Sequence, residues 1–283
     1  MAFDAISVIV PHYNRPDFAR RALLSICNQT VKPAEILLVD DCSSPENLEK
    51  LSELSSLATI LCTSRNMSDS GARNFGAQHA CGKWLAFLDD DDCWLPDKLE
   101  RQIRYLEAHP NVEALGGGMT MVTPDGRKEY WGDKYTHRLT LASALCYTAS
   151  MAQALMIRRD VFMELGGYDT RLRNMADYEF GIRLLSSGRE THFLGEPLFV
   201  YYHGGWQQKS FQWKNMFKSE MKILDMHSGA ARKELGPLGG IRLKARCCRK
   251  YGLRKGRLLG RSVWAWGCIL EAIFGRVRGE FDE

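Results

Sequence analysis

The sequence predicts an α/β protein with a mostly parallel sheet covered by helices. Short apolar runs, several of them rich in β-branched residues, recur at residues 6–10, 36–39, 59–61 and 84–88. Segments with helical periodicity separate these runs, and this alternation is typical of parallel sheets flanked by helices. The length of 283 residues is enough for one large domain or two small ones.

The first strand–helix–strand unit covers residues 6–39. The run ISVIV ends at Pro11, and the run ILLV ends at Asp40. Neither run alternates regularly between polar and apolar residues, as expected for strands that are buried on both faces. Between them, apolar residues recur at helical spacing after Asp17, a candidate helix cap, and Pro33 closes the segment.

The same pattern then repeats along the chain. Ser44 with Pro45 begins a helix, and a strand at 59–61, a helix at 72–80 and the strand WLAFL at 84–88 follow. Open α/β sheets bind ligands at the carboxyl ends of their strands. Pro11, Asp40 and Asp89 fall at those ends.

The second half of the sequence has a mixed pattern. We expect a helix from Pro96 to about residue 108, a strand at 115–122, a turn at 124–126, a helix at about 177–186 and a strand at 198–202. No linker or repeat interrupts residues 1–234. We therefore expect one domain with two functional halves, 1–110 and 111–234.

The charge is distributed unevenly. Residues 235–283 hold 11 basic and 4 acidic side chains, a net charge of +7 within an overall +4. We expect a basic helical tail here, and its stretch 242–274 ends in an amphipathic aromatic segment that suits an anionic membrane surface. The alternatives are nucleic acid, which also attracts positive charge, and a helix that packs on the body with a solvated basic face.

The cysteines and the chain start indicate the compartment. The nine cysteines are an odd number without a C-x-x-C pair, which favours free thiols in a reducing compartment. Residues 1–4 lack the basic start of a signal peptide. The apolar run 263–274 contains Glu271 and is too short to span a bilayer. We expect a cytoplasmic protein, with peripheral attachment to the cytoplasmic face of the membrane as a variant.

Four consecutive aspartates, Asp89 to Asp92, follow the strand WLAFL. Carboxylates crowded at the end of a buried strand repel one another and lose hydration, which is costly unless a cation compensates. Oxygen ligands without nearby cysteine or paired histidine favour Mg²⁺ or Mn²⁺, which commonly connect carboxylates to phosphates. The alternative is a solvated acidic turn or a helix start.

Four short motifs occur in order: PHYN at 11–14, VDDCS at 39–43, GARNFG at 71–76 and FLDDDD at 87–92. Together they resemble the motifs of family 2 glycosyltransferases, over about residues 5–205. The resemblance implies a GT-A fold and an inverting transfer from a nucleotide diphosphate sugar. The acceptor would be a hydroxyl of a saccharide or lipid-linked saccharide, as in cell-surface polysaccharide synthesis.

The resemblance also assigns the donor-binding residues in residues 1–110, the nucleotide-sugar-binding half. Pro11 and Tyr13 would line the nucleobase, with the Tyr13 ring against its face, and Asn14 belongs to the same loop. Asp41 would accept the imide N–H of the base, which favours uracil; a polar turn is the alternative. Arg73 would lie beneath the nucleotide, or form a buried ion pair with an aspartate.

In the D-x-D motif of this family, Asp89 would hold the donor ribose and Asp91 the metal ion on the diphosphate. Asp90 stands between them and is counted with the donor-binding residues. Because Asp92 follows, the sequence leaves open which carboxylate touches the metal, and we assign Asp91. His203 lies in a segment that resembles the family's Y-R-x-H. It would complete the coordination of Mg²⁺ or Mn²⁺ or touch the diphosphate, and a plain loop residue is the alternative.

The catalytic base maps to the half that would bind the acceptor, residues 111–234. Residues 166–169 (GGYD) and 175–179 (MADYE) resemble the family's GG-F-D and its later Glu-Asp pair, with Ala176 in place of the Glu. Asp177 would take the proton of the acceptor hydroxyl as its oxygen attacks the anomeric carbon. Capping of the following helix is the alternative role, and it is compatible with catalysis.

Other protein classes fit less well. A Rossmann dehydrogenase needs a G-x-G-x-x-G turn where residues 11–16 read PHYNRP. A sugar nucleotidyltransferase would have a Gly-rich, basic loop at the same place. A nucleic-acid- or membrane-binding protein with a non-catalytic nucleotide-binding domain would explain the basic tail but not the acidic cluster, and we do not expect nucleic acid as a partner.

Overall fold

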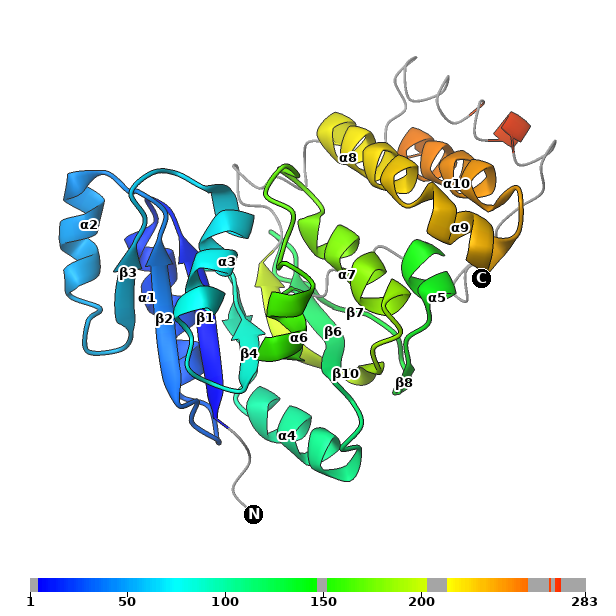
Figure 1. The fold of residues 1–283 in the computed structure, drawn as a ribbon. Coiled ribbons are helices and arrows are strands. Elements are labelled where there is room, and N and C mark those ends of the chain that lie inside the picture. Colours follow the sequence, from blue (N-terminus) through cyan, green and yellow to red (C-terminus); the bar gives the residue numbers. More distant parts are fainter. Residues whose placement is uncertain (1–4, 147–151, 203–212, 254–264, 266–267, 271–283) are drawn as a thin grey trace. The chain divides into compact units, whose positions relative to one another are not determined.

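The computed structural model describes residues 5–146, 152–202, 213–253, 265 and 268–270 (Figure 1). The chain forms two compact units. The first, here called the sheet unit, comprises residues 1–139, 150–171 and 188–205. The second, the helical unit, comprises residues 140–149, 172–187 and 206–283. The chain therefore leaves the sheet unit at residue 140, returns twice, and ends in the helical unit.

The strands of the described chain form one sheet, which lies in the sheet unit. Its order is β3-β2-β1-β4-β9-β6-β10-β5, with β7 beside β6 and β8 beside β10. The strands are β1 (Ile6–His12), β2 (Glu35–Asp40), β3 (Thr59–Cys62), β4 (Trp84–Phe87), β5 (Cys93–Trp94), β6 (Ala114–Val122), β7 (Lys128–Trp131), β8 (His137–Arg138), β9 (Met156–Arg158) and β10 (Thr191–Tyr202).

Parallel pairing runs through β3, β2, β1 and β4, and joins β6 to β10. The short strand β9 lies between β4 and β6 and is antiparallel to both. The predicted α/β class with a largely parallel sheet is confirmed.

Helices cover both faces of this sheet (Figure 1). In the sheet unit they are α1 (Pro16–Cys27), α2 (Pro45–Ser52), α3 (Ser68–His79), α4 (Lys98–Ala108) and α6 (Arg159–Glu164). Strand side chains alternate between the faces. Val8 and Val10 of β1 share a buried cluster with Ile26 of α1. Ile9, between them, faces α3, where a Cβ added at Gly76 would lie 2.6 Å from Ile9 Cγ2.

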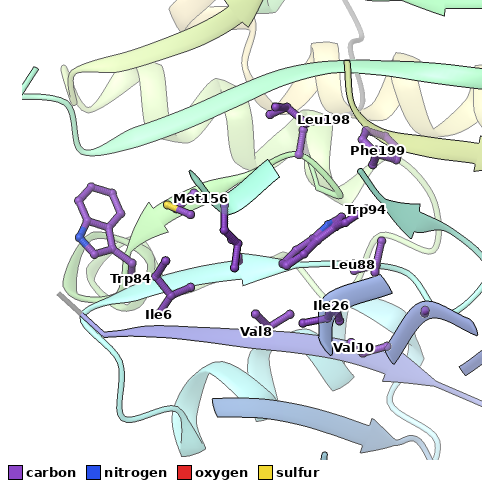
Figure 2. Packing of buried hydrophobic residues seen from close by; sticks show 14 of the residues in the cluster. Ile6, Val8, Val10, Ile26, Trp84, Leu88, Trp94, Met156, Leu198 and Phe199 are labelled. Carbon is purple, nitrogen blue, oxygen red and sulfur yellow. The ribbon is translucent and has the colours of Figure 1, made fainter. Parts of the chain in front are cut away.

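The main buried cluster lies on the α1 face of the sheet (Figure 2). It combines β1, β4, β9 and β10 with α1 and α4, and Trp94 lies in its middle. Trp94 is 3% exposed and its Nε1–H donates to the carbonyl of Gln153 at 3.1 Å. This packing fixes the strand ends that carry the acidic cluster.

Several elements differ from the prediction. Asp17 does not cap α1, because Arg15 occupies the N-cap position without a side-chain hydrogen bond, and Asp17 lies in the first turn. Strand β10 begins seven residues before the predicted start, since the register shifts between Leu194 and Phe199 interrupt its apolar pattern. The short elements α6, β5, β7, β8 and β9 were not predicted, nor were the helices over Leu141–Cys146, Trp213–Met226 and Ser228–Leu235.

The helical unit contains α5 (Leu141–Cys146), α7 (Ala176–Ser186), α8 (Trp213–Met226), α9 (Ser228–Leu235) and α10 (Gly239–Leu253). Helix α10 contains the first part of the predicted basic tail, and its Leu243 and Tyr251 are buried. Lys250 pairs with Glu220 of α8 at 2.8 Å. Across the described residues, every helix is too short or too polar to cross a bilayer.

Candidate active site

The predicted donor-binding residues of the sheet unit lie at one edge of the sheet. β1 is parallel to β2 and β4, so the carboxyl ends of these strands meet there. Tyr13, Asp41 and Asp89 follow the three ends directly or within two residues. Pro11 lies within β1, opposite Val39 of β2.

The acidic cluster brings together Asp89, Asp91 and Asp92. One oxygen from each of these carboxylates lies within 4.8 Å of those from the other two. Burial, reinforced by Asp89, raises the pKa of Asp91 to about 6. Burial and the neighbouring carboxylates raise the pKa of Asp92 well above its usual range. Asp92 Oδ2 is buried and has no hydrogen-bond partner within the described chain.

Such an arrangement of hard oxygen donors, with one buried oxygen unsatisfied, fits a divalent cation of the Mg²⁺ or Mn²⁺ type. A cation would offset the repulsion that raises these pKa values. Asp92 therefore joins Asp91 as a candidate ligand.

Asp90 points away from this group, toward protein partners. Its Oδ2 lies 2.9 Å from His12 Nδ1, and its Oδ1 accepts from the guanidinium of Arg15. The backbone N–H of Arg15 donates to His12 Nε2 at 3.3 Å, so the proton of the neutral ring is on Nδ1, where it donates to Asp90. Arg15 Nη1 also pairs with Asp91 Oδ2 at 2.9 Å. A direct contact of Asp90 with the donor stays a prediction.

Asp89 is held by two donors from different elements. Arg73 of α3 pairs with Asp89 Oδ1, and Gln153 Nε2 donates to Asp89 Oδ2 at 2.6 Å. Burial opposes the charge of Arg73, but Asp89 raises its pKa. The structure thus shows the buried ion pair with an aspartate that was one of the two predicted roles of Arg73. The other role, a position beneath the nucleotide, stays a prediction.

Asp41 is buried at the end of β2. Its Oδ1 accepts from the backbone N–H of Met67 at 2.7 Å and from the hydroxyl of Thr63 at 3.2 Å. Burial raises the pKa of Asp41, against these hydrogen bonds. These contacts fix the carboxylate beside the start of α3.

The two loop residues after β1 differ in their surroundings. Tyr13 is 47% exposed, as a ring that stacks on a ligand must be in the free protein. Asn14 has a left-handed backbone with φ of 55°. Its side-chain oxygen accepts from the N–H of Ser44 at 2.8 Å and from Asn47 at 3.1 Å. Asn14 thus joins the loops after β1 and β2.

The predicted base, Asp177, belongs to the helical unit and lies in the first turn of α7. The N-cap position is Met175, with φ of 61° and no capping side chain, so Asp177 is not the cap. Glu179 is buried and paired with Arg183 at 2.8 Å and His227 at 3.0 Å, which gives it a structural role. His203 lies outside the described residues.

Sequence reasoning missed four residues around the acidic cluster: His12, Arg15, Arg21 and Gln153. Arg21 of α1 donates to the Asp91 carbonyl at 2.5 Å, and its guanidinium lies 4.2 Å from the ring centre of Tyr202. The available signals were the place of His12 within the PHYN motif and that of Arg15 directly after it. Gln153 stands in a segment without periodicity, so nothing marked it.

The profile of glycosyl transferase family 2 matches residues 7–166. An uncharacterized glycosyltransferase of Haemophilus influenzae is 33% identical over 203 residues, 68% of this chain and 66% of that protein's length.

Two solved structures show a similar fold at low sequence identity. TarS residues 1–349 of S. aureus, in complex with UDP-GlcNAc, has a TM-score of 0.70 and 16% identity, covering 93% of this chain and 79% of that one. A mannosyltransferase of Pyrobaculum calidifontis, in complex with GDP-Man and Mn²⁺, has a TM-score of 0.61 and 16% identity, covering 96% and 81%. These likenesses confirm the GT-A fold. With a family profile that matches more than half of its length and motifs that lie where the profile does, the chain belongs to glycosyl transferase family 2.

Proposed function

We propose that this protein is an inverting, metal-dependent glycosyltransferase that moves a sugar from a UDP-sugar to an acceptor hydroxyl. The observation that carries the proposal is the gathering of Asp89, Asp91 and Asp92 at the strand ends, with a buried oxygen left unsatisfied. Asp41 lies at the end of β2, which is separated from β4 by β1 in the sheet. Solved structures of the same fold hold UDP-GlcNAc, or GDP-Man with Mn²⁺, which supports a nucleotide-sugar donor.

The side chains of the sheet unit would bind and orient the donor. Asp41 would accept the imide N–H of uracil, because its carboxylate is held in place by Met67 and Thr63. Tyr13 would cover the face of the base. Asp89, fixed at both oxygens, would accept from the ribose hydroxyls. Asp91 and Asp92 would hold the Mg²⁺ or Mn²⁺ ion, with His203 as a further candidate ligand; when bound, the ion supplies positive charge beside the departing diphosphate.

Asp177 would act as the general base. It would remove the acceptor proton while the acceptor oxygen attacks the anomeric carbon from the side opposite the diphosphate, and this single displacement inverts that centre. Glu179 cannot readily replace it, because Arg183 and His227 lower the pKa of this buried carboxyl against the effect of burial and occupy its oxygens.

The test is a screen of nucleotide sugars for release of the free nucleotide with Mn²⁺, Mg²⁺ or chelator. Release of UDP that requires the metal and is lost in Asp91→Asn supports the proposal. Release that does not require the metal contradicts the proposed metal dependence. Release of a nucleotide other than UDP contradicts uracil as the nucleobase of the donor.

For the acceptor, we propose a saccharide or a lipid-linked saccharide at an anionic membrane surface. The supporting feature is the basic stretch 242–274, of which α10 contributes the first part. Because Leu243 and Tyr251 of α10 are buried, the test must keep α10. Replacement of Arg254, Lys255 and Arg257 by glutamine should weaken sedimentation with anionic vesicles, since each basic side chain near such a surface contributes about 1 kcal/mol. Unchanged sedimentation would point to a soluble acceptor.

A further inference from the structure

The carboxylate of Asp89 is clamped between a charged and a neutral donor. Arg73 occupies Oδ1, and the amide of Gln153 donates to Oδ2 at 2.6 Å. The Asp89 side chain is 25% exposed, whereas Gln153 is 8% exposed and Arg73 is also buried. A carboxylate has about four lone-pair positions. The two protein donors use two of them and thereby fix which positions remain for a ligand.

The chemistry of the second donor matters because of the neighbouring carboxylates. A second cation beside Asp89 would reduce the negative field that Asp91 and Asp92 present to a metal ion. An amide N–H orients a carboxylate without adding charge. Gln153 therefore fixes the rotation of Asp89 and leaves the charge of the cluster unchanged.

Gln153 is itself held on a rigid base. The indole N–H of Trp94 donates to the Gln153 carbonyl at 3.1 Å. The next residue, Ala154, accepts from Gln102 Nε2 of α4 at 2.8 Å. Trp94 and Gln102 are both buried, so buried side chains pin the backbone at two consecutive residues and aim the Gln153 side chain at Asp89.

We propose that Gln153 is a positioning residue that orients the Asp89 carboxylate for its hydrogen bonds with the ribose hydroxyls of the donor. This inference rests on the proposed function, in which Asp89 contacts that ribose. Loss of the amide would let the Asp89 carboxylate rotate about its bond to Arg73. The protein would then distinguish a ribonucleotide less well from its deoxy analogues, even with the acidic cluster intact.

The experiment compares the affinity for UDP with that for 2′-deoxy-UDP and 3′-deoxy-UDP, by calorimetry at saturating Mn²⁺. The selectivity is the larger of the two ratios of analogue Kd to UDP Kd. Gln153→Met keeps the length of the side chain and removes the donor, and we expect the selectivity to fall about 3- to 10-fold, the range for one hydrogen bond. Asp89→Asn serves as the reference variant, because it changes the carboxylate that is proposed to contact the ribose.

The matched control is Gln29→Met, which removes another buried glutamine, one that donates to the backbone carbonyls of Ser25 and Leu95 and not to residues 153–154. We expect it to lower the unfolding temperature but to leave the selectivity as in the wild type. A second test variant, Trp94→Phe, keeps an aromatic ring at this position and removes the indole N–H that donates to the Gln153 carbonyl, and we expect a smaller loss of selectivity. It keeps the inference testable if Gln153→Met fails to fold.

Unchanged selectivity in Gln153→Met would overturn the inference. If Gln153→Met does not fold, unchanged selectivity in Trp94→Phe would overturn it instead. An equal fall in Gln29→Met would overturn it as well, because a general loss of rigidity would then be the cause. If the wild type binds UDP but shows no selectivity, the ribose contact of Asp89 fails and the inference fails with it. If the wild type binds no UDP, the proposed function fails too.

Discussion

Metal binding should stabilise this protein in a pH-dependent way, and Asp91 determines the direction. Its pKa is about 6 in the folded chain, against about 4 for an aspartate in an unfolded chain. The folded chain therefore binds this proton more tightly than the unfolded chain. Above pH 6 the metal-free protein carries a cost of about 3 kcal/mol from the two-unit difference, and this cost disappears as the pH falls from 6 to 4.

A divalent ion needs the ionised carboxylate. With a pKa of about 6, Asp91 is about 97% ionised at pH 7.5 and about 9% at pH 5, so metal affinity should fall about tenfold from this group alone. Mn²⁺ at about 100 times its Kd at pH 7.5 stabilises by about 2.7 kcal/mol, and the same concentration at pH 5 by about 1.4 kcal/mol. The increase in unfolding temperature should be about 5–10 °C at pH 7.5 and about half of that at pH 5.

Thermal unfolding with and without Mn²⁺ at the two pH values measures this difference. The raised pKa of Asp92 acts in the same direction, so the loss at pH 5 is a lower limit. Asp91→Asn is the control, because it should show a smaller increase at both pH values and lose the part of the pH dependence that Asp91 contributes. An equal Mn²⁺ effect at both pH values in the wild type would refute the reasoning.

Three further changes have defined outcomes. Asp177→Asn should lower kcat by about 10²–10⁴-fold while calorimetry shows normal UDP binding, the effect of losing a general base; near-normal turnover would reassign the base. Lys98 is fully buried over the Trp94 ring, its amine lacks a hydrogen-bond partner among the described residues, and burial lowers its pKa well below the usual range. Lys98→Met should therefore raise the free energy of unfolding in urea by about 1–2 kcal/mol, and a decrease would show that the amine is satisfied. Gly76→Ala brings a Cβ to 2.6 Å from Ile9 Cγ2 and should destabilise by about 1–3 kcal/mol in the same assay, more than helix propensity returns; unchanged stability would mean that the strand yields.

The sequence alone predicts the strands that carry the candidate site. β1, β2 and β4 are buried on both faces, so their sequences show no regular alternation of polar and apolar residues, and polar residues such as Asp40 and Asp89 mark their ends. β7 lies exposed beside β6, and β9 has three residues, so neither produces a run that periodicity can detect. β10 was predicted too short because Gly195 and Pro197 interrupt it.

Partner choice within the site could not be predicted from the sequence. Asp90 and Asp91 are neighbours in an acidic run, yet one is buried against His12 and the other belongs to the group of candidate metal ligands. The difference arises because the loop turns after Asp89 and places successive side chains on different sides. Gln153 reaches Asp89 from 64 positions away, and no local pattern records such a contact.

The contacts of Asp90 with His12 and Arg15 make the three residues interdependent under substitution. Asp90→Ala alone would leave the Nδ1–H of a fully buried imidazole without its acceptor and remove one of the two carboxylates that Arg15 bridges. A loop with a different middle residue in its D-x-D could therefore be grafted onto this scaffold only together with the residues at positions 12 and 15. Natural variation at these three positions should accordingly be correlated, although 75 positions separate Arg15 from Asp90.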